Sequence, residues 1–214
     1  MCRPVLKRPL QDVYNLEGER HTICSFDQTQ IAKGYVLYDL PFGRGRALVS
    51  QAGAALNALL GGWTVSGDFY YGTGTPMRIT ANVYYPGINN VYADVVPGCN
   101  IGANWNGQVG GTYFNPACFT NPPNGEFGNA PGHLAGLRNP GLATEDLGVS
   151  KSMRFRCESC ELRVYFQMFN VFNRHGVTGP NTQIGTAGFG TVMAQDLNGL
   201  PGPRVGQFGA RFNF

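Results

Sequence analysis

The chain has little charge and no long hydrophobic run. Only 14% of its 214 residues are charged, the formal net charge is +3, and the arginines are scattered. We therefore expect no nucleic-acid-binding surface, because such surfaces gather basic residues on one face. A membrane-spanning helix needs about 18 consecutive apolar residues. The best candidate, residues 47–62, is interrupted by Ser50, Gln51 and Asn57, so a helical span is not expected.

Signatures of catalysis and of metal binding are missing as well. His21, His133 and His175 are far apart and lack the spacing that places two ligands on one helical face. Ser66 and Ser150 do not stand in a complete G-x-S-x-G motif. We therefore expect no catalytic residues, no metal site and no cofactor, and we expect the protein not to be an enzyme.

Glycine and proline are abundant instead, with 31 and 14 residues, which favours strands and turns over helices. The chain is 43% hydrophobic but its mean hydropathy is −0.17. A transmembrane β-barrel has such a composition, because only alternate residues face lipid. Six cysteines, most of them in Gly/Pro/Asn-rich segments, indicate disulfides formed in an oxidising compartment.

Five segments alternate polar and apolar residues with the period of a β-strand. In the C-terminal segment Phe208, Phe212 and Phe214 share one face, opposite Gln207 and Arg211. About ten residues at roughly 3.3 Å each, tilted by about 40°, rise on the order of 25 Å, which matches the apolar band of an outer-membrane barrel. The predicted strands are residues 31–40, 63–71, 143–155, 161–173 and 205–214.

The lengths of the links between these strands also fit a barrel. Outer-membrane barrels have long extracellular loops and short periplasmic turns. The links 72–142 and 174–204 are long, whereas 156–160 is short. The intermediate link 41–62 is expected on the periplasmic side, with a short helix in its Ala/Leu-rich part, residues 47–60. The predicted fold class is all-β: an antiparallel meander of about five long strands that forms the C-terminal part of a large transmembrane β-barrel.

The alternation assigns the side chains to two environments. Aromatic residues at the ends of the lipid-facing rows, among them Trp63, Tyr71 and Phe155, are expected to form interfacial girdles. Lys151 is the exception among the lipid-facing residues, and we expect it to snorkel to the nearer interface. The residues expected to line the lumen or to contact a plug are Lys33, Asp39, Asp68, Glu161, Arg163, Gln167 and Arg211.

Seven sequence motifs follow one another in a defined order over nearly the whole chain, from about Asp12 onward. They are DVYNLEGERHTICSFDQTQ, GYVLYDLPFGRGR, LLGGWTVSGDFYYGTGTP, FNPACF, GEFGNAPGHLAGLRNPG, ELRVYFQMFNVFNR and QFGARFNF. Together they resemble the C-terminal barrel of Oar-like TonB-dependent outer-membrane receptors, which have an N-terminal β-sandwich, a plug and a barrel of about 22 strands. The resemblance implies uptake of a ligand across a Gram-negative-type outer membrane, powered through the TonB complex.

The resemblance covers only part of such a receptor. The sequence contains no plug, no TonB-contacting box and no N-terminal sandwich, and five strands are fewer than the roughly eight of the smallest closed barrel. We therefore expect a fragment, with residues 1–30 as an extracellular loop remnant and 31–214 as the last barrel strands and loops. Expected partners are outer-membrane lipid, the remainder of the receptor, the TonB complex through the missing N-terminal part, and the barrel-assembly machinery. Phe212 and Phe214 would be the C-terminal assembly signal.

The cysteines fall into a predicted pair and an open set. Cys99 and Cys118 flank a Gly/Asn-rich stretch of the longest link, and their pairing looks like a loop staple found in some members of the family, so we predict a disulfide between them. Cys157 and Cys160 form a CxxC in a predicted turn without a second CxxC or a neighbouring histidine, and we interpret them as structural. The partners of Cys2, Cys24, Cys157 and Cys160 stay open.

The longest link combines aromatic rings with asparagine amides, the groups that a peptide or sugar site uses. The candidate ligand-contacting residues are Tyr84, Tyr85, Tyr92, Trp105 and Tyr113. The competing interpretation is that these rings pack on one another at the mouth of the barrel.

A secreted, soluble β-sandwich that binds glycans or acts in adhesion is the second functional class. It would explain the strands, the loops and the disulfides without lipid. A sandwich needs a second apolar sheet to cover the phenylalanine row, however, and only five strand-forming segments are present.

Overall fold

The computed structural model describes residues 11–12, 14, 22–88, 91–155, 160–194 and 201–214. The chain divides into two compact units. The first, which we call the loop unit, comprises Met1–Gln30, Gly72–Gly141 and Gly176–Asp196. The second, the sheet unit, comprises Ile31–Tyr71, Leu142–His175 and Leu197–Phe214. Within the described ranges no helix has the length and apolar character needed to cross a membrane.

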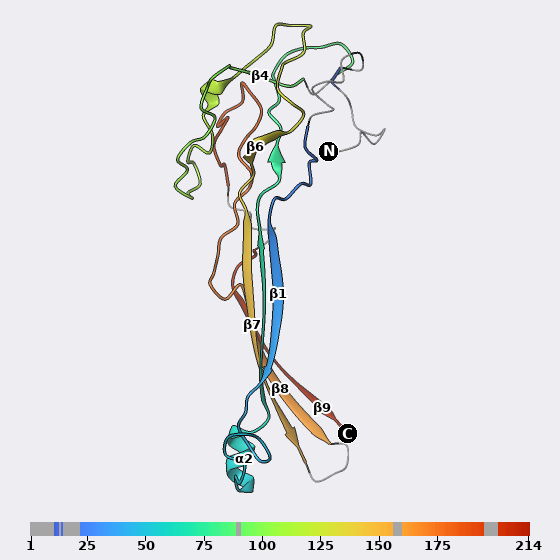
Figure 1. The fold of residues 1–214 in the computed structure, drawn as a ribbon, viewed down its shortest axis with the longest axis vertical. Coiled ribbons are helices and arrows are strands. Elements are labelled where there is room, and N and C mark those ends of the chain that lie inside the picture. Colours follow the sequence, from blue (N-terminus) through green and yellow to red (C-terminus); the bar gives the residue numbers. More distant parts are fainter. Residues whose placement is uncertain (1–10, 13, 15–21, 89–90, 156–159, 195–200) are drawn as a thin grey trace. The chain divides into compact units, whose positions relative to one another are not determined.

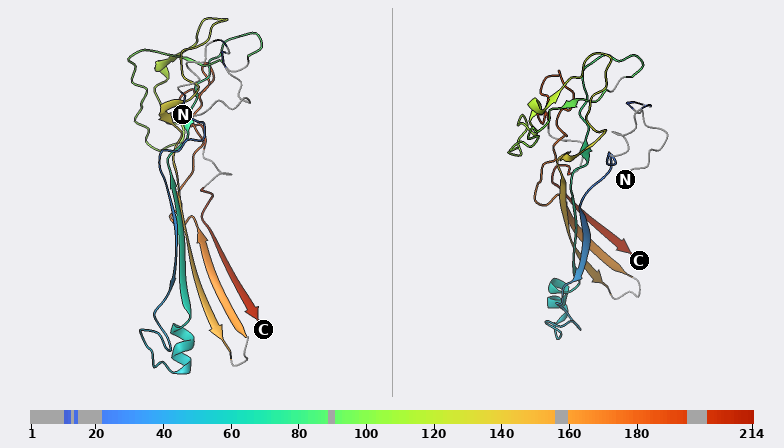
Figure 2. Two further views of the ribbon diagram at one scale, coloured as in Figure 1. Left: turned by 45° about the vertical axis from the view of Figure 1, so that its right-hand side comes forward. Right: turned by 45° about the horizontal axis from the view of Figure 1, so that its top comes forward.

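The sheet unit is built on one five-stranded antiparallel sheet in which every long strand pairs with the next along the chain (Figure 1). The order β1-β2-β7-β8-β9 is that of a meander, and Figure 2 shows the strands side by side from two further directions. This confirms the predicted all-β fold class and the antiparallel meander. The sheet is open, with β1 and β9 at its edges. The strands are β1 Ile31–Asp39, β2 Trp63–Gly72, β7 Leu142–Arg154, β8 Glu161–Phe169 and β9 Val205–Asn213.

The register of β7, β8 and β9 places the predicted apolar residues on one side of the sheet. In an antiparallel pair, directly opposed residues point to the same face. The three strands pair without a shift, so apolar residues meet apolar residues in successive rows. The rows across β7, β8 and β9 are Leu147, Met168 and Gly206; Val149, Phe166 and Phe208; Lys151, Val164 and Ala210; and Met153, Leu162 and Phe212.

One strand boundary differs from the prediction by more than one residue. The strand predicted to reach residue 173 ends at Phe169, because Asn170 and Asn173 have φ angles of 49° and 51°, in the left-handed region that stops a strand. Asn170 is buried and its side chain accepts from Arg174 N (2.8 Å) and donates to Gly202 O (2.7 Å). The short helix predicted within residues 47–60 is present as α2, Ala54–Leu60.

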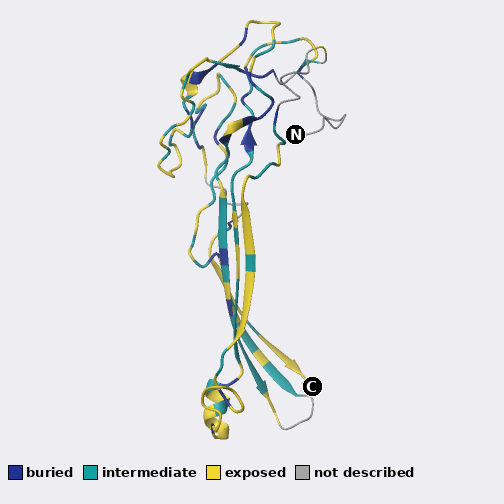
Figure 3. Ribbon diagram, in the orientation of Figure 1, coloured by how far each residue is buried: buried dark blue, intermediate teal, exposed yellow. Residues whose placement is uncertain are grey.

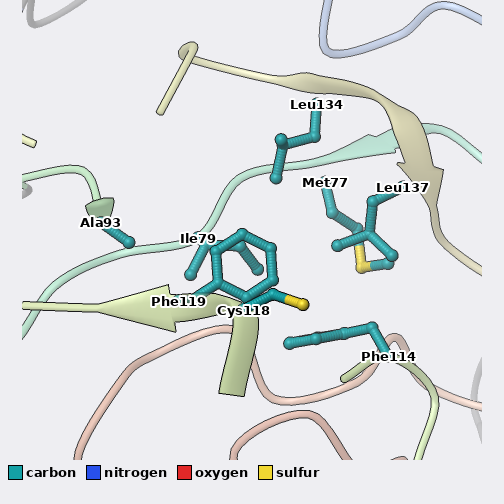
Figure 4. Packing of buried hydrophobic residues seen from close by; sticks show 8 residues of the cluster. All are labelled: Met77, Ile79, Ala93, Phe114, Cys118, Phe119, Leu134 and Leu137. Atoms are coloured by element: carbon teal, nitrogen blue, oxygen red, sulfur yellow. The ribbon is translucent and has the colours of Figure 1, made fainter. Parts of the chain in front are cut away.

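The loop unit has its own hydrophobic core, which the prediction of a plain loop at 72–142 missed. Two short antiparallel pairs frame it, β3 (Pro76–Met77) with β6 (Leu134–Arg138), and β4 (Asp94–Val95) with β5 (Phe119–Thr120). The 3-10 helix η1 (Pro116–Cys118) leads directly into β5. Figure 4 shows the core side chains pointing toward one another, and in Figure 3 buried residues gather in the segments that carry them. The core consists of Met77, Ile79, Ala93, Phe114, Cys118, Phe119, Leu134 and Leu137.

Disulfides occur in both units. Cys99 and Cys118 form a bond with Cα atoms 5.5 Å apart, and Cys118 itself is part of the core. Cys24 and Cys160 are each disulfide-bonded as well. Cys2 and Cys157 lie outside the described residues, so the pairings left open by the sequence stay open.

Replacing both Cys99 and Cys118 by serine should loosen the loop unit. The bond closes a loop with a sequence separation of 19, and the chain-entropy model assigns such a closure about 3 kcal/mol. We expect limited proteolysis of the purified protein to cut within residues 97–120 much faster than in the wild type, whereas the sheet unit resists as before. Equal cleavage rates in the two proteins would contradict a stabilising role for this bond.

Candidate functional site

The most unusual surface of the sheet unit is its apolar face, which nothing covers among the described residues. Phe208 is 73% exposed and Phe166 is 43% exposed, although both stand in the middle of the strand rows. A large contiguous apolar surface of this kind marks an interaction with another protein or with lipid. The soluble β-sandwich considered above does not fit, because a second sheet would bury these rings.

One end of this apolar face carries a paired charge. We call it the loop end, where β2 finishes and β7 begins. Glu145 lies on the same side of β7 as Leu147, and its side chain is only 9% exposed. Arg174 holds the carboxylate through Nε (2.8 Å to Oε2) and Nη2 (2.7 Å to Oε1), and Tyr71 Oη donates to Oε1 at 2.5 Å. The hydrogen bond to Glu145 raises the pKa of Arg174.

The opposite end of the apolar face carries Lys151, whose positive charge is met by backbone carbonyls and an aromatic ring. We call it the hairpin end, where β7 finishes and β8 begins. Lys151 Nζ donates to Leu59 O (3.0 Å) and Gly61 O (2.7 Å), the carbonyls at the C-terminal end of α2. Its ammonium group also lies 4.7 Å from the centre of the Trp63 ring. These contacts supply partners for a cation that the apolar face would otherwise leave unpaired.

Aromatic rings lie close together at the hairpin end of the apolar face. Phe155 lies 6.4 Å from Phe212 between ring centres, and Phe212 lies 6.1 Å from Phe214 in a stacked arrangement. Phe214 is almost fully exposed. The two residues expected to form the C-terminal assembly signal therefore present their rings to the surroundings.

The other side of the sheet is polar. Asp39 Oδ1 accepts from Thr64 Oγ1 at 2.7 Å, and Gln207 Nε2 donates to Gln167 Oε1 at 2.5 Å. Arg163, opposite Arg211, donates to Glu161 Oε1 at 3.3 Å. The structure thus places the polar residues assigned to the lumen on β8 and β9 together on one face. Lys33 and Asp68 stand on β1 and β2.

The five candidate ligand-contacting aromatic residues differ in how exposed they are and in what their rings contact. Tyr92 is 3% exposed, with the Arg78 guanidinium 5.0 Å from its ring centre. Tyr85 stacks on Phe127 at 4.3 Å. Trp105 lies 5.1 Å from Tyr113, whose hydroxyl donates to Arg138 O, and burial raises the pKa of Tyr113. Tyr84, at 76%, has the most exposed ring of the five. Most of these rings therefore make the mutual contacts of the packing interpretation, and Tyr84 offers the most surface to a ligand.

Arg138 organises the loop unit in a way that the sequence did not reveal. Its Nη2 binds Asp27 Oδ2 at 2.6 Å, and its Nη1 donates to Asp27 O (3.0 Å) and Gly74 O (3.2 Å). Three segments distant in the sequence therefore meet on one guanidinium. The string GLRNPG contained this arginine, but no local pattern identifies a partner 111 residues away.

No group of three or more potential metal ligands occurs in the part of the chain that the structure describes. His133 and His175 therefore belong to no such group among the described residues, and His21 is outside the described ranges.

The Glu145–Arg174 pair predicts a measurable stability difference between two arginine variants. R174A leaves a mostly buried carboxylate with only Tyr71 as a partner, which should cost on the order of 2 kcal/mol. R204A is the matched control, because the bond that Arg204 makes among the described residues of the same unit is a long one, to Val171 O at 3.4 Å, and the change should alter stability by less than about 0.5 kcal/mol. The measurement is the midpoint of urea unfolding, and equal shifts for the two variants would refute the role of the pair.

The comparison with known families agrees with this two-faced sheet. A family model described as an outer membrane beta barrel domain matches residues 6–207. No curated protein and no solved structure matches the chain. The match covers nearly the whole sequence, and barrels of this kind have an apolar outer face and a polar interior. The chain therefore belongs to the outer membrane β-barrel domain family and is located in the outer membrane.

Proposed function

We propose that this chain supplies barrel strands and extracellular loops to a TonB-dependent receptor that imports a ligand across the outer membrane. In this proposal the chain performs no catalysis of its own. The ordered strings from Asp12 to Phe214 that resemble Oar-like receptors favour this transporter class over other outer-membrane barrels. The strands would form part of the wall, and the loop unit would contribute to the external entrance.

The observation that carries the proposal is the open, two-faced sheet. Its apolar side suits lipid and its polar side suits a wet interior, as in a barrel with a wide lumen. Backbone groups along an open edge cannot remain unpaired in a membrane. The edge strands β1 and β9 therefore require further strands. The remainder of the receptor would provide these strands, a plug and the contact with the TonB complex.

The loop unit supports an extracellular binding role. Its disulfide, its core and the Arg138 contacts hold long loop segments in one arrangement. A preordered loop loses less conformational entropy when it binds a ligand. The exposed Tyr84 ring, with asparagines in the same segment, suits a peptide or sugar.

Arginine substitutions on neighbouring residues of β9 should separate the two faces. Phe208 belongs to the apolar rows, whereas Gln207 pairs with Gln167 on the polar face. F208R should destabilise the barrel by about 2–4 kcal/mol, because a cation would face hydrocarbon, and Q207R should cost far less. The folded fraction after assembly into phospholipid vesicles, read from heat-modifiable mobility on gels, measures the difference. Equal losses in the two variants would mean that lipid does not cover the Phe208 side.

Uptake assays test transport itself. Fluorescently labelled oligopeptides and oligosaccharides are offered to cells with the gene, without the gene, and with the gene but without TonB. The proposal expects that accumulation of at least one probe is lost in both deletion strains. Accumulation that needs the gene but persists without TonB would instead indicate a passive pore.

Tyr84 and Val109 provide a matched pair for the loop unit, since both are exposed apolar side chains of the same long link. If Tyr84 contacts the ligand, Y84A should lower the affinity for the imported probe roughly 5- to 100-fold, the loss of about 1–3 kcal/mol that removal of a binding aromatic causes. V109A should leave the affinity unchanged. Binding to purified protein measures both, and identical affinities would remove Tyr84 from the site.

A further inference from the structure

The short helix α2 leaves two of its three leucines exposed. Its helical spacing puts Leu56, Leu59 and Leu60 on one side. Leu56 and Leu59 are 43% and 67% exposed, and no residue of α2 is buried. The polar Asn57 instead faces the preceding loop, where its Oδ1 accepts from Arg44 N at 2.6 Å. This is the reverse of a helix that packs on a soluble domain, which would bury its leucines.

The C-terminal end of α2 is fixed to the lipid side of the wall. Leu59 O accepts from Lys151 Nζ and from Trp63 Nε1, both at 3.0 Å, and Gly61 O accepts from Lys151 Nζ at 2.7 Å. Lys151 shares its row with Val164 and Ala210 of the apolar face. The end of α2 is therefore attached to the apolar face of the sheet and not to its polar face.

The position of α2 in the barrel and its charge point to one leaflet. The link that contains α2 joins β1 to β2 at the same end of the sheet as the β7–β8 connection, which is the periplasmic end in outer-membrane barrels. Residues 41–62 include Arg44 and Arg46 and contain no Asp or Glu. Such a segment suits the phosphate groups of phospholipids, and tryptophan is enriched at this depth.

We propose that α2 lies in the interface of the periplasmic leaflet, with Leu56 and Leu59 inserted among phospholipid chains and with Lys151 and Trp63 clamping its end to the barrel wall. The occupant of this leucine surface is phospholipid. The inference uses only the membership in the barrel family and the contacts of α2, so it stands or falls separately from TonB-dependent transport.

Fluorescent amino acids at two positions of α2 test the proposal. An environment-sensitive residue replaces Leu59 in one variant and Ala58 in another, since Ala58 lies outside the leucine side, about 100° round the helix from Leu59. The whole protein is reconstituted into vesicles of phosphatidylethanolamine and phosphatidylglycerol, with or without bromine atoms on the acyl chains. Heat-modifiable gel mobility confirms that each variant has folded.

The expected result is a contrast between the two positions. Brominated chains should remove about half of the emission at position 59 and much less at position 58, because interfacial helices reach roughly 5–10 Å into the acyl boundary. Aqueous iodide should show the opposite order. If iodide quenches both positions equally, α2 lies in water, and if neither reagent quenches position 59, protein covers it. Either of these outcomes overturns the proposal.

A second variant tests the clamp. K151M keeps an unbranched side chain of nearly the same length but removes the ammonium group that donates to Leu59 O and Gly61 O. The difference between positions 59 and 58 in quenching by brominated acyl chains should become at least about twofold smaller, since the end of α2 is no longer held at the barrel wall. A contrast that is unchanged in K151M would show that Lys151 does not position the helix.

Discussion

The register between β7, β8 and β9 is the constraint on which the rest of the structure depends. Side chains alternate strictly along a strand, so a slip of one residue would move the whole phenylalanine row to the polar side. The pairing runs without interruption from Leu147 with Met168 to Arg154 with Glu161, and from Glu161 with Asn213 to Phe169 with Val205. Because of this continuity, one surface of the sheet suits hydrocarbon while the other suits water.

The charged residues at the margins of the apolar face are satisfied in two different ways. Glu145 receives side-chain donors, a bidentate guanidinium from Arg174 and the hydroxyl of Tyr71. Lys151 uses backbone acceptors, the carbonyls left without helical partners at the end of α2. In both cases the protein supplies hydrogen-bond partners for a charged group, because an unpaired charge is costly in the hydrocarbon part of a membrane. The two clusters therefore delimit the apolar part of β7, with Leu147 and Val149 between them.

The loop unit shows how long connections acquire a defined structure. The loop segments are held by contacts between residues far apart in the sequence, such as Arg138 with Asp27 and His133 with Thr22. A disulfide and an aromatic core, with Phe114 packed edge-on against Phe119 and Phe189, add to these contacts. A scaffold of this kind presents a few exposed side chains, Tyr84 among them, from fixed positions.

The sequence by itself determined the strands and their two faces, because period-two alternation is a local property that backbone geometry converts directly into sidedness. It also located the helix near residue 60 and singled out Lys151 as the exceptional charge on the apolar side, whose partner in the protein it left open. Only the tertiary structure decided which partner that was, that Glu145 shares the apolar side and binds Arg174, that Tyr92 is buried, and that β8 stops at Asn170. These features depend on side chains from distant segments meeting in space, and no pattern of neighbouring residues encodes such meetings.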